Sequence, residues 1–164
     1  MDKSNTMIQI TEYNPSYHSD VVSLITHIQQ QEFAIPITYE QQPDLADIPA
    51  LYDRFWVALH DDKVVGTIGL KIIEDFAIMR KMFVAENFRG KAFQIAQKLL
   101  ETLEKECIQM GLEKIYLGTT EFFKAAHRFY ERNNYVGVEK SQLPLAFPVM
   151  KVDTIFYLKS IDAK

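Results

Sequence analysis

Apolar and polar residues follow strand-like and helix-like periods along most of the chain. Residues 8–13 alternate in the manner of a short, half-buried strand. Apolar residues then recur at helical spacing over 21–28, which predicts a helix that ends in a run of glutamines. The apolar segment 33–43 contains prolines and is predicted to be a loop, and residues 44–52 are predicted to form a second short helix.

Three strand-like runs follow one another at residues 54–60, 64–73 and 76–84, with short polar turns between them. Because consecutive strands joined by short turns pair antiparallel, these runs predict a meander. A helical pattern after residue 89 and an apolar run at 114–118 come next. The resulting strand–helix–strand order predicts a parallel crossover.

A further helical pattern, from Phe122 to Tyr130, precedes two strand-like runs at 135–139 and 153–159. We therefore predict an α/β protein with a mixed sheet, mostly antiparallel with one parallel strand pair, flanked by about four helices. Its 164 residues, 48% of them apolar, suit a single domain over residues 1–164.

Composition argues against several classes of protein. The formal charge of −4 disfavours a broad basic surface for nucleic acid. No apolar run approaches the roughly 20 residues of a membrane span, and the first residues lack the apolar centre of a signal peptide, so we expect a soluble, cytoplasmic protein with no membrane partner. The single cysteine, Cys107, falls on the apolar face of a predicted helix, and the four histidines lack metal-ligand spacing. No metal is predicted.

The loop before the helix at residue 92 has the residues of an anion site. The first turn of a helix leaves backbone N–H groups without intrahelical partners, and the helix dipole adds positive charge there. Arg89 and Lys91 add side-chain cations, Gly90 lets a ligand approach the backbone, and Ala92 and Ala96 are small. Phosphate is the natural ligand of such a site. The alternative is a basic surface loop before an ordinary amphipathic helix.

Two motifs lie in the second half of the chain: Arg-Gly-Lys at 89–91, after a strand, and Ala-His-Arg-Phe-Tyr-Glu-Arg-Asn-Asn-Tyr at 126–135. In this order and separation they resemble the Gcn5-related N-acetyltransferase (GNAT) superfamily, and the order of predicted elements resembles it over nearly the whole chain. In that family, an Arg or Gln, two residues, Gly, one residue and Gly or Ala bind the pyrophosphate of acetyl coenzyme A.

The chain departs from the family pattern in two places. Counting forward from Arg89 puts Ala92 and Gln94 at the two small-residue positions, whereas counting back from the apolar pair on the following helix puts Gln94 and Ala96 there. The loop is therefore longer than usual, and Gln94 replaces a glycine in either register. Phe123 replaces an asparagine often found three residues before the helix alanine, which removes one expected polar contact to the cofactor.

The resemblance implies acetyl coenzyme A as the co-substrate, held by the fourth predicted strand, the loop after it and the helix that carries the second motif. The residues assigned to it on this basis are Met82, Phe83, Val84, Arg89, Gly90, Lys91, Ala92, Phe93, Gln94, Ala96, Ala126 and Phe129.

The resemblance also implies two catalytic groups. Tyr130 is expected to protonate the departing thiolate, and a backbone N–H near Phe83 or Val84 to stabilise the developing oxyanion. The alternative for Tyr130 is a tyrosine buried for packing, with its hydroxyl hydrogen-bonded. For the general base, position makes Glu74 and Glu121 candidates, at the turn before the fourth predicted strand and just past the fifth. Each is alternatively a solvated or helix-capping carboxylate, and a chain of water molecules is a further alternative.

Phe33, Tyr39 and Phe147 belong to apolar loops that flank the thioester in this fold, and we expect them to frame the acceptor. The function predicted is acetyl-coenzyme-A-dependent N-acetyl transfer to a primary amine of a small molecule or peptide, by direct attack in a ternary complex. One alternative is a non-catalytic acyl-coenzyme A binding or sensing module of the same fold. Another is a different nucleotide-binding α/β protein, for which the glycine-rich phosphate motifs are missing. A homodimer is compatible with the resemblance.

Overall fold

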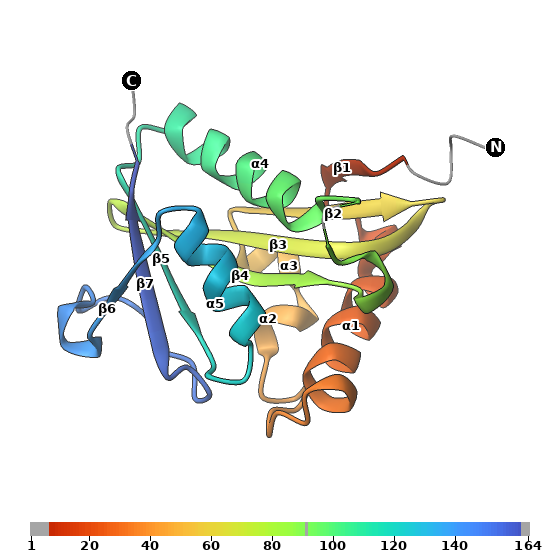
Figure 1. The fold of residues 1–164 in the computed structure, drawn as a ribbon, viewed down its shortest axis with the longest axis horizontal. Helices are drawn as coiled ribbons and strands as arrows, with labels where there is room; N and C mark the ends of the chain where they lie inside the picture. Colours follow the sequence, from red (N-terminus) through yellow and green to blue (C-terminus); the bar gives the residue numbers. More distant parts are fainter. Residues whose placement is uncertain (1–6, 91, 162–164) are drawn as a thin grey trace.

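The computed structural model describes residues 7–90 and 92–161. At its centre lies a seven-stranded sheet with the strand order β1-β2-β3-β4-β5-β7-β6 (Figure 1). Neighbouring strands are antiparallel except β4 and β5, which are parallel. This arrangement confirms the predicted fold class. The strands are β1 (Gln9–Glu12), β2 (Arg54–His60), β3 (Lys63–Ile73), β4 (Phe76–Val84), β5 (Lys114–Thr119), β6 (Val136–Val138) and β7 (Ile155–Ser160).

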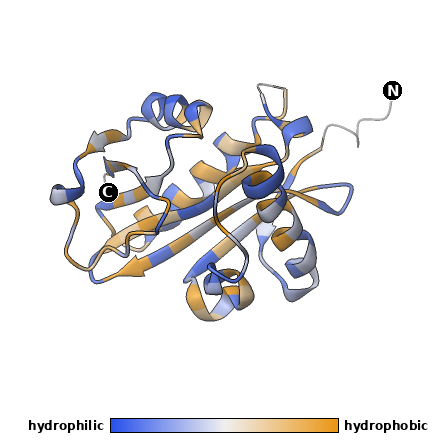
Figure 2. Ribbon diagram, turned by 90° about the horizontal axis from the view of Figure 1, so that it is seen from below, coloured by the Kyte–Doolittle hydropathy of each residue, from blue (hydrophilic) through white to orange (hydrophobic). Residues whose placement is uncertain are grey.

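Helices cover both faces of the sheet, and each carries polar and apolar residues along its length (Figure 2). The α-helices are α1 (His18–Thr26), α2 (Pro43–Ala46), α3 (Ile48–Leu51), α4 (Ile95–Gln109) and α5 (Lys124–Arg132). A π-helix (His27–Glu32) continues α1, and short 3-10 helices lie at Pro15–Tyr17, Glu86–Phe88 and Lys140–Gln142. Residues 44–52 therefore form two short helices where one was predicted. Asp47 ends α2 and caps α3 by accepting a hydrogen bond from the Ala50 N–H, and Pro49 has no N–H with which to continue α2.

The two faces of β2 separate the two largest apolar clusters. Trp56 and Ala58 pack in the cluster that contains α4 and Tyr130 of α5, whereas Val57 and Leu59 pack with α1, α2 and α3. This division follows from strand geometry, which points successive side chains to opposite faces. Helix α4 lies close to the sheet because Gly66 has no side chain, and a Cβ there would come within 2.9 Å of Ile95.

Strands β4 and β5 share only two paired positions, Ala77 with Ile115 and Ile78 with Tyr116. Beyond Ile78 the two strands separate (Figure 1). From Met79 to Val84, β4 is therefore paired with β3 on one side, and no strand of the described residues pairs with it on the other. Such a strand edge offers backbone N–H and C=O groups to a ligand.

A β-bulge interrupts β4 at the same place. Thr67 of β3 pairs with Phe83, and Gly69 pairs with Arg80, so one residue of β3 faces both Lys81 and Met82. Lys81 has a φ of 56°, and its carbonyl accepts a hydrogen bond of 2.7 Å from the Thr67 hydroxyl. A bulge breaks the alternation of side chains, so neighbouring residues can face the same way.

Candidate active site

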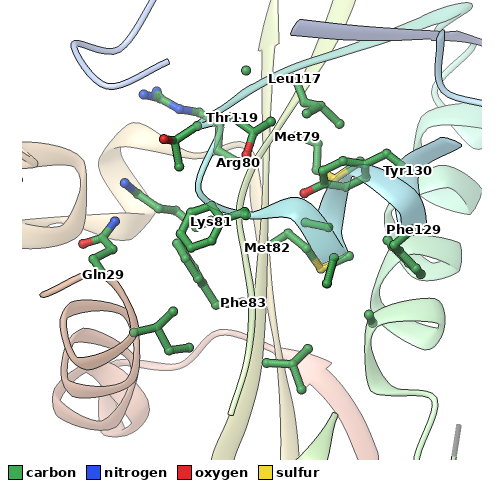
Figure 3. A pocket seen from close by; sticks show the side chains of 18 of the residues that line it. Gln29, Met79, Arg80, Lys81, Met82, Phe83, Leu117, Thr119, Phe129 and Tyr130 are labelled. Atoms are coloured by element: carbon green, nitrogen blue, oxygen red, sulfur yellow. The ribbon is translucent and has the colours of Figure 1, made fainter. Parts of the chain in front are cut away.

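A cavity of about 630 Å³ lies where β4 and β5 separate. Its walls come from β4, the end of β5, α5, the π-helix with the loop after it, and the segment before β7. Polar and apolar groups divide within it. Figure 3 shows the polar ends of Gln29, Arg80 and Lys81 on the left of the view, and Phe129 and Tyr130 on the right.

Most of the residues predicted to hold acetyl coenzyme A lie together in this cavity. Ala92 and Phe93 do not line it, and Phe93 instead packs on Phe88, with ring centroids 5.2 Å apart, and on His60. Lys91 falls outside the residues that the structure describes. The nine that line the cavity are Met82, Phe83, Val84, Arg89, Gly90, Gln94, Ala96, Ala126 and Phe129.

Among the described residues of the loop between β4 and α4, two have left-handed conformations. Gly90 has a φ of 101°, which a glycine adopts without strain. Gln94 has a φ of 52° and directly precedes the first helical residue, Ile95. The helix was predicted to begin at Ala92 but begins three residues later, at Ile95. The loop before it is therefore long. A left-handed residue at Gln94 explains in physical terms why a glycine is usual there.

The predicted phosphate ligand Arg89 has a carboxylate partner within the protein. Its two terminal nitrogens bond to the two carboxylate oxygens of Glu32, Nη2 to Oε1 at 2.7 Å and Nη1 to Oε2. Its Nε donates to the Val84 carbonyl at 2.8 Å, and its guanidinium carbon lies 6.0 Å from the centroid of Phe33. The end of the π-helix therefore holds Arg89 against the loop.

Tyr130 is buried, yet its hydroxyl opens onto the cavity. Within the described residues, the Tyr130 hydroxyl has no hydrogen-bond partner. Every fully buried side-chain oxygen or nitrogen atom of these residues does have a partner, so the Tyr130 hydroxyl is not fully buried. The Tyr130 hydroxyl must then reach the cavity, and Figure 3 shows it pointing from α5 toward β4. Burial, with a smaller effect from Tyr157, raises the pKa of Tyr130, which keeps the phenol protonated at neutral pH.

The two predicted bases lie outside the cavity. Glu74 is exposed in the β3–β4 turn and Glu121 is exposed just past β5, and neither lines the cavity. The carboxylate that does line it is Asp153, in the segment before β7. Its Oδ2 accepts a hydrogen bond of 3.0 Å from the Met150 N–H, and burial raises the pKa of Asp153.

The predicted acceptor residues divide in the same way. Phe33 and Phe147 line the cavity, whereas Tyr39 packs against the cluster of α1, α2 and α3. Phe123, at the position where the family has an asparagine, packs edge-on against Phe33 and Phe83, with centroids 4.8 and 5.9 Å apart. An aromatic wall thus stands where a polar contact was expected.

Sequence reasoning missed the polar half of the cavity. Gln29 and Gln42 are buried and exchange two amide hydrogen bonds of 3.0 and 2.8 Å. The Lys81 ammonium donates to Gln42 Oε1 at 2.6 Å and lies 3.6 Å from the Asp44 carboxylate. The available signal was Arg80-Lys81, two adjacent cations in an otherwise apolar strand.

A buried charge network supports Lys81. Asp44 also accepts a hydrogen bond of 2.5 Å from the Tyr52 hydroxyl. Burial alone would raise the pKa of Asp44, but Lys81 and Tyr52 hold it below its ordinary value. Burial lowers the pKa of Lys81, against the opposing effect of Asp44. The ion pair therefore balances one of the two cations in the polar half.

Comparison with known proteins gives one consistent family. The model of the acetyltransferase (GNAT) family matches residues 22–135. A GNAT-family acetyltransferase from Staphylococcus aureus has a TM-score of 0.91 and 35% identity, and the match covers 95% of this chain and 100% of that one. The PaiA N-acetyltransferase of Thermoplasma acidophilum, solved in complex with coenzyme A, has the same fold, with a TM-score of 0.74 at 16% identity over 94% of this chain and 99% of that one.

Among curated proteins, the zebrafish (Danio rerio) N-acetylaspartate synthetase is 36% identical over 95 residues. The match covers 54% of this chain and 33% of that protein, so the chain spans about a third of the length of this relative. Within the described residues, no helix is long and apolar enough to cross a membrane, and no group of three or more His, Cys, Asp or Glu side chains is arranged to hold a metal ion.

Proposed function

The chain belongs to the acetyltransferase (GNAT) family, and from this premise we propose that it is an acetyl-coenzyme-A-dependent N-acetyltransferase acting on a primary amine of a small molecule. The observation that carries the proposal is the Tyr130 hydroxyl, protonated and open to the cavity beside the unpaired edge of β4. Both the coenzyme and the amine would enter this cavity, so transfer would be direct, within a ternary complex. Free aspartate is one acceptor to test, since a relative is named for its acetylated form.

The cavity suits an extended thioester co-substrate in two respects. The edge of β4 from Met79 to Val84 offers backbone donors and acceptors to the amide groups of a pantetheine arm. Gly90, Ala92 and Gln94 are exposed just before α4, where the helix dipole favours phosphate. We propose that these two segments hold acetyl coenzyme A, which would supply the acetyl group as a reactive thioester.

The chain's own groups would then do the remaining work. A backbone N–H of β4 near Phe83 or Val84 would donate to the carbonyl oxygen as negative charge develops on it. The amine would attack in its neutral form and lose its remaining extra proton to a chain of water molecules. Tyr130, whose raised pKa keeps it protonated at neutral pH, would give its proton to the departing sulfur and regain one from the same water. The aromatic wall of Phe33, Phe83 and Phe123 would keep water from the thioester.

The first experiment is thermal unfolding with and without acetyl coenzyme A. A ligand that binds only the folded protein at about 100 times its dissociation constant stabilises it by roughly 2.7 kcal/mol. We expect a clear upward shift in Tm, and acetylation of at least one amine from a panel that includes aspartate. No shift with millimolar coenzyme would contradict the proposal.

The second experiment tests Tyr130. Tyr130→Phe should lower kcat by about 100-fold while changing coenzyme affinity little, because the hydroxyl acts only on the leaving group. Tyr17→Phe is the matched control, since Tyr17 packs against the cluster of α1, α2 and α3 outside the cavity, and it should keep full activity. A protein that binds acetyl coenzyme A but acetylates nothing would instead be the acyl-coenzyme A binding module considered from the sequence.

A further inference from the structure

Arg80 is a cation in the cavity that forms no ion-pair contact with the described residues. Its side chain is partly buried and lines the cavity, and its hydrogen bond within the described residues goes to the thioether sulfur of Met150. Among the described residues, no carboxylate lies within ion-pair distance of the Arg80 guanidinium. A guanidinium has five N–H donors, and a thioether is a weak acceptor. Most of the hydrogen-bonding capacity of Arg80 is therefore open to a ligand.

Neighbouring carboxylates act on Arg80 only from beyond ion-pair distance, although its positive charge favours the ionised forms of Asp44 and Asp153. Asp44 is engaged by Lys81 and by the Tyr52 hydroxyl. Asp153 lies against the backbone of Gly118, where a Cβ would come within 2.6 Å of its Oδ2, and it accepts the Met150 N–H. Asp153 and Arg80 line the same cavity without an ion-pair contact, although the charge of Arg80 opposes the rise in the pKa of Asp153. The polar half thus presents a positive group and a separate negative group.

The bulge in β4 explains why this cation faces the cavity. In a regular strand, Arg80 and Lys81 would point to opposite faces of the sheet. Because Lys81 adopts a left-handed conformation, both side chains turn toward the same side, as Figure 3 shows. Burying two adjacent cations there is unfavourable unless anions balance them. Asp44 pairs with Lys81, whereas Asp44 and Asp153 act on Arg80 only from beyond ion-pair distance, so a ligand anion could pair with it directly.

We propose that Arg80 binds a carboxylate of the acceptor, so that the acceptor is an amino acid or a similar amine with a free carboxylate nearby. This inference rests on the proposed acetyl transfer. The carboxylate would pair with the guanidinium, an arrangement that an arginine fork matches well. Asp153 is the complementary anion for the amine while it is an ammonium ion, which must lose a proton to water before it attacks. Phe33, Ile35 and Phe147 are the apolar residues that face the rest of the molecule.

The test compares two pairs of amines that differ only in the carboxylate: L-phenylalanine with L-phenylalaninamide, and L-leucine with L-leucinamide. Binding is measured as the further rise in Tm of the complex with coenzyme A, which cannot react. We expect each acid to stabilise the complex and to bind on the order of 10- to 100-fold more tightly than its amide. Equal shifts for acid and amide, including no shift for either, would overturn the proposal.

Substitution of Arg80 locates the effect. Arg80→Gln should remove the preference for acid over amide, whereas Arg80→Lys should keep part of it because the charge remains. Arg128→Gln is the matched control, since Arg128 is exposed on α5 and does not line the cavity, and it should leave the preference unchanged. Tm values of the free variants show whether each has folded. A preference that survives Arg80→Gln in a folded protein would also overturn the proposal.

The two proposals fail in different ways. Failure to bind acetyl coenzyme A, or to acetylate any amine, would contradict the proposed function. Binding of coenzyme and acetylation of amides as readily as acids would leave that function intact and would contradict the carboxylate site alone.

Discussion

The contact between Glu32 and Arg89 predicts that removing a negative charge will strengthen coenzyme binding. To bind a phosphate, Arg89 would have to turn away from Glu32. The Arg89 side chain is 37% exposed and the Glu32 side chain 17%. Exposed ion pairs contribute about 0.2–1 kcal/mol, and we take about 1 kcal/mol for this bidentate, partly screened pair. Because 1.4 kcal/mol corresponds to tenfold, Glu32→Gln should tighten coenzyme A binding by about fivefold.

Isothermal titration with coenzyme A at low and high salt measures this effect. Arg89→Ala should weaken binding by about tenfold, because it removes a charge-assisted hydrogen bond, and the loss should shrink in high salt. Glu40→Gln controls for the change in net charge, since Glu40 is exposed and does not line the cavity. It should leave affinity unchanged.

The double variant decides between two explanations. If Glu32 acts by holding Arg89, Glu32→Gln should have no effect once Arg89 is alanine. If it still tightens binding there, Glu32 acts by simple repulsion of the phosphates. Weaker binding by the single variant Glu32→Gln would refute the reasoning as a whole.

Two further predictions concern stability and reactivity. Asp44→Asn should destabilise the protein by about 3 kcal/mol at neutral pH by leaving Lys81 buried without its partner, with exposed Asp75→Asn as the control in urea unfolding. Since folding lowers the pKa of Asp44, its contribution to stability is complete above the ordinary value of 3.8 and is lost as pH falls through the lower value of the folded protein. A difference in unfolding free energy between wild type and variant that persists in stronger acid would contradict this. Burial, with Glu104 and Glu106 nearby, raises the pKa of Cys107 to about 12, so iodoacetamide should label it only in unfolded protein, and rapid labelling of native protein would count against its burial.

The strands were the most predictable part of the fold. β2 and β4 have the bounds expected from the sequence, and β3 differs by one residue, because alternating apolar residues between polar turns specify a strand locally. Cys107 lies in the core as its helical position indicated. The short helices α2 and α3 were less predictable, because Asp47 and Pro49 interrupt an apolar pattern that suits one helix.

The site was predictable only where one segment carries it. The cavity-lining residues from Met82 to Ala96 follow one another along the chain, so a motif could identify them. The Glu32–Arg89 pair joins residues 57 positions apart, and Asp153 enters the cavity from near the end of the chain. At the bulge, the Lys81 carbonyl accepts a hydrogen bond from the Thr67 hydroxyl of a neighbouring strand. None of these contacts leaves a local pattern in the sequence.

The short junction between β4 and β5 links the width of the cavity to the way these two strands pair. Only two residue pairs of the described strands, Ala77–Ile115 and Ile78–Tyr116, join β4, which carries Arg80, to β5, which leads into α5 and Tyr130. A change of side-chain volume at these two residue pairs would alter the angle at which β4 and β5 diverge, and so the width of the cavity between them. Acceptor size could then be engineered from residues that touch no substrate.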